Sequence, residues 1–201
     1  MSGEPDSGAD VPLHRRTITV TARGCAPGEL EVTAELRDER PWARPENGGD
    51  GRAAVIHHMA LVVRVRLADR LITSARADMG TFPHAECPLI TPVFEGLAGL
   101  SIASGFNRAV QERFRGAAGC SHLYELARLL GPAVIQASIS AAARSRPPGR
   151  PTHDPRSSAG VLNSCHIWGP GGVGLRKLEA GWQPGLGPMP VPEVSTFKRP
   201  E

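Results

Sequence analysis

The sequence lacks a strong excess of either charge and a long apolar run. Its 23 Lys and Arg against 20 Asp and Glu give a formal net charge of +3 at pH 7, too small to indicate a nucleic-acid or anionic membrane partner. No stretch approaches the roughly 20 apolar residues that span a bilayer. The first ten residues also lack the basic and apolar character of a secretory signal. We therefore expect a cytoplasmic protein without nucleic-acid or membrane partners.

Internal repeats and a phosphate-cradling glycine loop are also missing. The run Gly169-Pro170-Gly171-Gly172 is a turn signal that matches no complete nucleotide fingerprint, so we expect no nucleotide cofactor. The four cysteines have spacings unlike those of a small disulfide-stapled scaffold, which favours reduced thiols. A length of 201 residues with 40% apolar side chains suits one domain with a single core.

Alternation of apolar and polar residues predicts four strands in the first half of the chain. Residues 16–21 and 29–37 alternate, and Leu30, Val32, Ala34 and Leu36 of the second segment share one face. The same period recurs in residues 57–67 and 71–79, separated by a short turn. The pattern indicates an antiparallel meander with one covered face.

Helical signals follow the strands. Pro88 suits a first helical position, which predicts a helix over residues 87–97. We expect further helices over 106–114 and from Ser121 through residue 130, with a separate segment after Pro132 toward residue 143. Strands first and helices after predict an α+β fold, an antiparallel sheet with helices packed on one face.

Four regions are expected along the chain. They are a disordered leader over residues 1–12, a single α+β domain over 13–143, a flexible linker over 144–160 and an irregular tail over 161–201. Because the tail carries tryptophans that are costly to expose, we expect it to wrap over the domain.

Cysteine and histidine carry the chemical signal. Cys87 and Cys120 precede predicted helices, where the helix dipole favours the thiolate. Cys165 is followed by His166, and alternation places His57 on the covered face of its strand. We predict that His57, Cys87 and Cys120 bind a zinc or iron ion, which leaves a position open to water or substrate. Cys165 is a candidate for a further ligand.

The proposed chemistry needs proton-transfer and substrate-binding groups as well. His122 and His166 are the candidate catalytic residues. The guanidinium groups of Arg15, Arg16, Arg64 and Arg66 are candidates for binding a small anionic substrate by paired hydrogen bonds. Together these residues predict a metal-dependent lyase or hydrolase that acts on a small molecule, with a homodimer as a possible state.

Three alternatives stay open at this point. The first is an iron–sulfur or sulfur-transfer accessory protein. The second is a metal-free binding or structural protein in which the cysteines are inert buried thiols, because an isolated cysteine is more often buried than reactive. The third is a metal-free thiol enzyme with Cys120 as the nucleophile and a histidine as the base.

The chain resembles a bacterial domain family of unknown function. The likeness spans nearly the whole chain, and its most specific mark is a Gly-Cys-Ser/Thr-His-Leu motif, here Gly119 to Leu123. Other shared features are His14-Arg15-Arg16, the strands around His57 and Met59, the Cys87-Pro88 helix start and the late Cys165-His166 pair. This resemblance implies no activity.

Residues 55–143 are also similar to the NifU/SufU-type iron–sulfur scaffold proteins. The strand from His57, Cys87 before a helix that ends in Leu97-Ala98-Gly99, and Cys120 before another helix carry the likeness. It implies a metal site at the sheet–helix junction, where His57 takes the place of the scaffolds' aspartate and Cys87 and Cys120 match two ligating cysteines. The scaffolds' first cysteine has no match near Val55, and their Gly-Cys-Gly setting is replaced by Glu86-Cys87-Pro88.

Overall fold

A computed structural model describes residues 12–42, 54–103, 105–145, 147, 149 and 162–181. Contacts divide the chain into two compact units, residues 1–137 and 138–201. Almost all of the predicted leader and linker, and much of the predicted tail with Trp182, lie outside the described residues.

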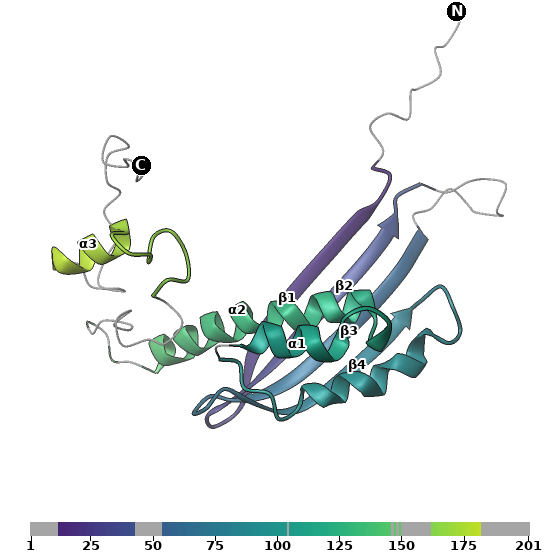
Figure 1. Ribbon diagram of the computed structural model, residues 1–201, viewed down its shortest axis with the longest axis horizontal. Coiled ribbons are helices and arrows are strands. Elements are labelled where there is room, and N and C mark those ends of the chain that lie inside the picture. The colour runs from purple at the N-terminus through teal and green to yellow at the C-terminus, as the bar shows by residue number, and fades with distance from the viewer. Residues whose placement is uncertain are drawn as a thin grey trace, which may run out of the picture. The chain divides into compact units, whose positions relative to one another are not determined.

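The first unit contains a four-stranded antiparallel sheet, shown in Figure 1. The strands are β1 (Arg15–Ala26), β2 (Glu29–Arg40), β3 (Ala54–Arg66) and β4 (Leu71–Thr81), and they pair in chain order. The predicted meander is confirmed. Each strand is longer than its apolar alternation indicated, because the backbone ladder continues past the alternating residues at the strand ends.

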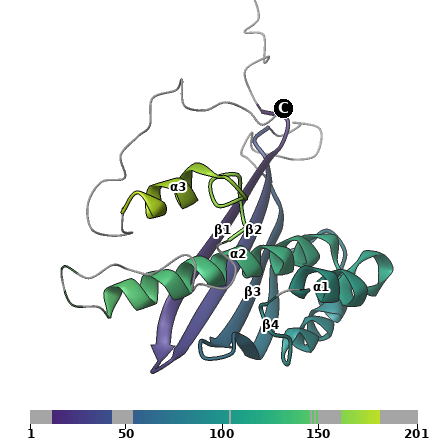
Figure 2. The same cartoon turned by 60° about the vertical axis from the view of Figure 1, so that its left-hand side comes forward.

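Helices pack on one face of this sheet, which confirms the α+β class. They are η3 (Cys87–Leu97), α1 (Phe106–Phe114), the single turn η4 (Gly116–Ala118) and the long α2 (Ser121–Arg144). In Figure 2 the ribbons of η3, α1 and the first half of α2 lie along the same side of the strands. The inward residues of β2 predicted from alternation are all buried, namely Leu30, Val32, Ala34 and Leu36.

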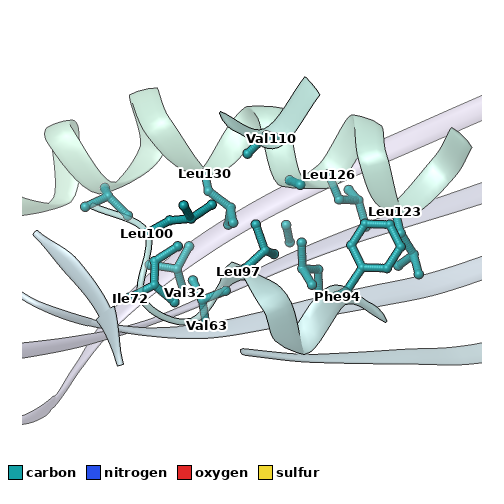
Figure 3. Packing of buried hydrophobic residues seen from close by; sticks show 14 of the residues in the cluster. Val32, Val63, Ile72, Phe94, Leu97, Leu100, Val110, Leu123, Leu126 and Leu130 are labelled. Carbon is teal, nitrogen blue, oxygen red and sulfur yellow. The ribbon is translucent and has the colours of Figure 1, made fainter. Parts of the chain in front are cut away.

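The core lies between the sheet and these helices. Figure 3 shows the inward side chains of Val32, Val63 and Ile72 meeting those of the helical layer, which include Phe94, Leu97, Val110, Leu123, Leu126 and Leu130. The rings of Phe94 and Phe114 stack with centroids 4.9 Å apart. This packing attaches the first turns of α2 to the sheet.

Two helical predictions need correction. The helix starting at Ser121 does not break at Pro132 but continues to Arg144. Pro132 is exposed, while Leu130 and Val134 on either side are buried, so packing offsets the hydrogen bond that proline cannot make. The segment from Cys87 to Leu97 is a 3₁₀ helix, with one proline near its start and Pro92 inside it.

The length and apolar character of α2 were not apparent as one long apolar run in the sequence. Among the described residues it is the one helix long and apolar enough, by length and composition, to cross a membrane. Core helices of globular proteins can have the same length and apolar composition. α2 is a helix of this kind in its first half, where Leu123, Leu126 and Leu130 are buried in the core.

The described part of the second unit contains the short helix α3 (Val173–Glu179), in a segment expected to be irregular. The turn before it is closed by hydrogen bonds from the Trp168 amide to the Cys165 carbonyl and from the Gly174 amide to the Ile167 carbonyl. A Cβ at Gly174 would lie 2.8 Å from the Trp168 ring, so glycine permits this close packing. The wrapping of the tail over the domain stays a prediction.

Candidate functional site

The inward faces of three strands end in one row of polar residues. Arg16 of β1 pairs with Asp38 of β2, and Asp38 pairs in turn with His57 of β3. Each of the three lies two positions from a residue that packs in the core, so alternation places it on the same face of the sheet. The core residues are Ile18, Leu36 and Met59, in the same order. The sheet register therefore brings a cation, a carboxylate and an imidazole together.

Asp38 is the centre of this row. It is only 1% exposed and is the one buried charged residue among those described. Arg16 donates from Nε to Oδ1 and from Nη2 to Oδ2, both at 2.7 Å. Hydrogen bonds from Arg16 lower the pKa of the Asp38 carboxyl to about 2, although burial acts in the opposite direction. Asp38 is therefore an anion at every physiological pH.

Three histidines surround the Asp38 carboxylate. His14 Nε2 lies 3.1 Å from Oδ1, His57 Nδ1 lies 3.1 Å from Oδ2, and His122 Nε2 lies 3.5 Å from Oδ2. The rings of His57 and His122 face each other with centroids 4.0 Å apart and an angle of 35° between their planes. His122 comes from the first turn of α2, so the site joins the sheet to the helical layer.

The surroundings of His122 favour the neutral form of its imidazole. Burial, followed by the charges of His57 and Arg16, lowers its pKa, while Asp38 and Glu125 act weakly in the other direction. A neutral ring keeps one nitrogen lone pair, which can accept a proton or bind a metal ion.

Cys120 lies beside His122. Its Sγ is 3.7 Å from His122 Nδ1 and 4.0 Å from the sulfur of Met59. The backbone before it is tightly packed, because a Cβ at Gly119 would lie 2.3 Å from the carbonyl oxygen of Phe114. Only glycine allows that approach, which sets Cys120 at the start of α2.

Among the described residues, one group of three or more side chains brings potential metal-ligand atoms together. It consists of Asp38, His57 and His122, whose ligand atoms all lie within 4.8 Å of one another. His57 was predicted as a ligand and His122 as a catalytic residue. Two of the predicted site residues are therefore brought together, with a carboxylate that the sequence analysis did not select.

The other predicted ligands have different surroundings. Cys87 is half-buried at the start of η3, packs against the core and does not belong to the Asp38 group. Cys120 contacts that group through His122 Nδ1, on the side of the ring away from Asp38. Cys165 and His166 are exposed residues of the second unit, and their part in the site stays a prediction.

The four predicted substrate-binding arginines separate into two groups. Arg16 is in the site, but its guanidinium binds Asp38 and, through Nη1, Glu125. The other three alternate to the opposite face of the sheet and are exposed, namely Arg15, Arg64 and Arg66. Arg64 and Arg66 form surface ion pairs with Glu31 and Asp69, at 3.5 and 2.6 Å.

Asp38, His14 and Glu125 are the site residues that sequence reasoning missed. The sequence did contain a sign of the site. On each of three strands the inward-facing residues change from apolar to polar at the same end of the sheet, at Arg16, Asp38 and His57. The predicted second strand stopped at residue 37, one position before Asp38. Polar residues on a buried face require partners, so the row was a sign of a site.

Comparison with known proteins places the chain in a family. The family described as protein of unknown function (DUF2889) matches residues 14–136, more than half of the chain, and the chain belongs to it. No curated protein and no solved structure matches the chain. The matched segment includes every residue of the Asp38 site.

Proposed function

We propose that this member of the family is a small metal-dependent enzyme, of lyase or hydrolase type, whose zinc or iron ion is bound by Asp38, His57 and His122. The observation that carries the proposal is the spacing of the donor atoms. Two ligand atoms, each about 2.1 Å from one ion, are separated by about 3.0 Å at right angles and about 3.4 Å at a tetrahedral angle. Asp38 Oδ2 lies 3.1 Å from His57 Nδ1 and 3.5 Å from His122 Nε2.

The donor set supports the same proposal. Two imidazoles with one carboxylate bind catalytic zinc and non-haem iron and leave coordination positions open. Such an ion supplies a Lewis acid that polarises a substrate oxygen or acidifies a bound water. Burial lowers the pKa of His122, which favours the unprotonated ring that binds a metal.

The surrounding residues hold these ligands in place. Arg16 and His14 hydrogen-bond to Asp38 and orient its carboxylate. With the His122 proton on Nδ1, Cys120 Sγ accepts from Nδ1–H at 3.7 Å and Nε2 is free for the ion. In this proposal Cys120 orients a ligand and does not bind the ion itself.

The substrate is proposed to be a small anionic molecule, used in the cytoplasm without nucleic-acid or membrane partners. Three of the predicted arginines lie on the other sheet face, so anion binding falls to the ion and to His14, whose side chain is 51% exposed. His14 is also placed to exchange protons with solvent. A role for His166 requires the second unit to reach the site.

A metal-free acid–base enzyme is the second candidate. It is favoured by the two hydrogen bonds from Arg16 to the oxygens of Asp38, because they balance the charge of the carboxylate without a metal ion. The 3.1 Å between Asp38 Oδ2 and His57 Nδ1 is also the distance of a hydrogen bond. In that case His57 and His122 transfer protons, and Cys120 beside His122 provides the nucleophile.

The remaining alternatives have less support. An iron–sulfur or sulfur-transfer role, which the NifU/SufU likeness implies, needs several exchangeable thiolates. Among the described residues, the metal-ligand group contains no cysteine. A purely structural role gives no reason for a buried carboxylate ringed by three histidines, because such groups are costly to bury.

Elemental analysis of the full chain, purified without a metal-affinity tag, tests the proposal. We expect near-stoichiometric zinc or iron in the wild type and loss of the ion in Asp38→Asn. The exposed Asp69→Asn is the matched control and should retain the ion. A metal-free wild type that binds neither zinc nor ferrous iron on titration would exclude the metal-dependent enzyme and leave the acid–base candidate.

A further inference from the structure

We propose that Glu125 is a positioning residue that makes the Asp38 site a cation site, an inference that rests on the metal-dependent function. Arg16 would otherwise neutralise the carboxylate that the ion needs. Its guanidinium donates to both oxygens of Asp38, so the pair alone has no net charge. Glu125 supplies a second negative charge.

Arg16 connects two carboxylates from different layers of the fold. Its Nη1 donates to Glu125 Oε2 at 2.7 Å, while Nε and Nη2 serve Asp38. The guanidinium therefore forms a planar bridge between the sheet and α2. The side chains of Arg16 and Glu125 are partly shielded from solvent, with 35% and 41% of their surface exposed.

The charges of this bridge favour a cation. Asp38 and Glu125 contribute two negative charges and Arg16 one positive charge. The set has a net charge of −1 beside the ligand nitrogens of His57 and His122. Without Glu125 the net charge is zero, and a divalent ion loses part of its attraction to the site.

The bridge also determines where His122 lies. Glu125 follows His122 by three residues, so both side chains leave α2 on neighbouring positions of one face. The hydrogen bond from Arg16 to Glu125 attaches this face of α2 to β1, at the strand position that pairs with Asp38. Glu125 therefore acts on the site through Arg16, without touching the ion.

The test is zinc affinity of the full-length chain in competition with a chromophoric chelator. Glu125→Gln keeps an oxygen that can accept from Arg16 and removes only the charge. We expect its zinc dissociation constant to rise about tenfold or more, the range of outer-shell substitutions, with little change in melting temperature. Glu125→Asp keeps the charge and should recover much of the affinity.

Glu112→Gln is the matched control, because Glu112 pairs with Arg108 on α1 through a comparable 2.8 Å contact away from the Asp38 group. It should leave zinc affinity unchanged. Equal affinities of wild type and Glu125→Gln would overturn the role of Glu125 alone. Equal weakening by Glu112→Gln would reduce the effect to overall charge and overturn it too. A wild type that binds no zinc or iron would overturn the proposed function and this inference with it.

Discussion

Arg16 and Asp38 face each other across β1 and β2, and the guanidinium of one meets both oxygens of the other at 2.7 Å. Asp38 is the one buried charged residue among those described, and Arg16 contacts it from the opposed position of the neighbouring strand. This contact explains how a carboxylate that is 1% exposed stays ionised. The predictions below depend on this pair and on the histidines around it.

Replacement of Asp38 by alanine should destabilise the first unit. The change leaves Arg16, His14 and His57 without their shared acceptor. Losses of charged, buried hydrogen bonds amount to about 2–4 kcal/mol. Asp69→Ala removes a comparable bidentate partner of Arg66 on the surface, where solvent screens the pair, and should cost much less than Asp38→Ala. Urea unfolding followed by circular dichroism measures both. Equal costs would show that Asp38 does not hold the row together.

Stability should fall as the solution becomes acidic, in two windows. The folded-state pKa of Asp38, about 2, is below its unfolded value of 3.8, so its contribution is complete above pH 3.8 and disappears as pH falls toward 2. The difference corresponds to at most about 2 kcal/mol. The pKa of His122 is lowered from 6.5, so the unfolded chain binds protons first and stability starts to decline as pH falls below 6.5.

Unfolding free energies from pH 8 to pH 3 check both windows. His122→Gln should remove the decline that begins below pH 6.5 and leave the one below pH 4. Asp38→Asn should reduce the lower decline, to which the exposed Asp69–Arg66 pair also contributes. A wild-type stability that increases toward pH 5 would contradict the direction expected for His122.

The proposed metal ligands can be separated from their neighbours on the same strand. His57→Gln should lose bound zinc or iron, because two ligands retain an ion far less strongly than three. His58→Gln is the matched control, since alternation turns His58 to the opposite face of β3 and it should keep the ion. Metal content by elemental analysis decides the outcome, and equal loss in both variants would argue against the assigned ligand set.

The cysteines distinguish the proposed function from its competitors. Cys87→Ser and Cys120→Ser should both retain the ion, because neither sulfur belongs to the ligand group. Once a substrate is known, Cys120→Ser should reduce activity moderately if Cys120 only orients His122 and abolish it if the thiol is the nucleophile. Loss of the ion from Cys87→Ser would restore the ligand set predicted from the sequence.

Gly119→Ala should destabilise the start of α2. The new methyl group would overlap the Phe114 carbonyl, and forced overpacking typically costs about 1–3 kcal/mol. Gly24→Ala, in β1, has no heavy atom within 4 Å of the new Cβ and should be nearly neutral. Thermal unfolding compares the two. A neutral Gly119→Ala would mean that the turn before Cys120 relaxes freely.

Local patterns in the sequence were sufficient for the layers of the fold. The alternation of Leu30 to Leu36 predicted a one-sided strand, and the structure buries those residues, because side chains alternate in any strand. The helix over 106–114 was predicted at its observed bounds, after the glycines that interrupt the preceding pattern. His57 and His122 were selected as chemical residues, and both are part of the candidate site.

Tertiary structure alone decided which residues meet. Asp38 looks like one more charged strand residue until the register aligns it between Arg16 and His57, and pairing register depends on contacts far apart in sequence. The continuity of α2 through Pro132 likewise depends on the burial of Leu130 and Val134, which outweighs the local preference to break. Helix starts near Cys87 and Cys120 were visible in the sequence, but the direction of each thiol is set by packing, and packing brings only Cys120 to His122.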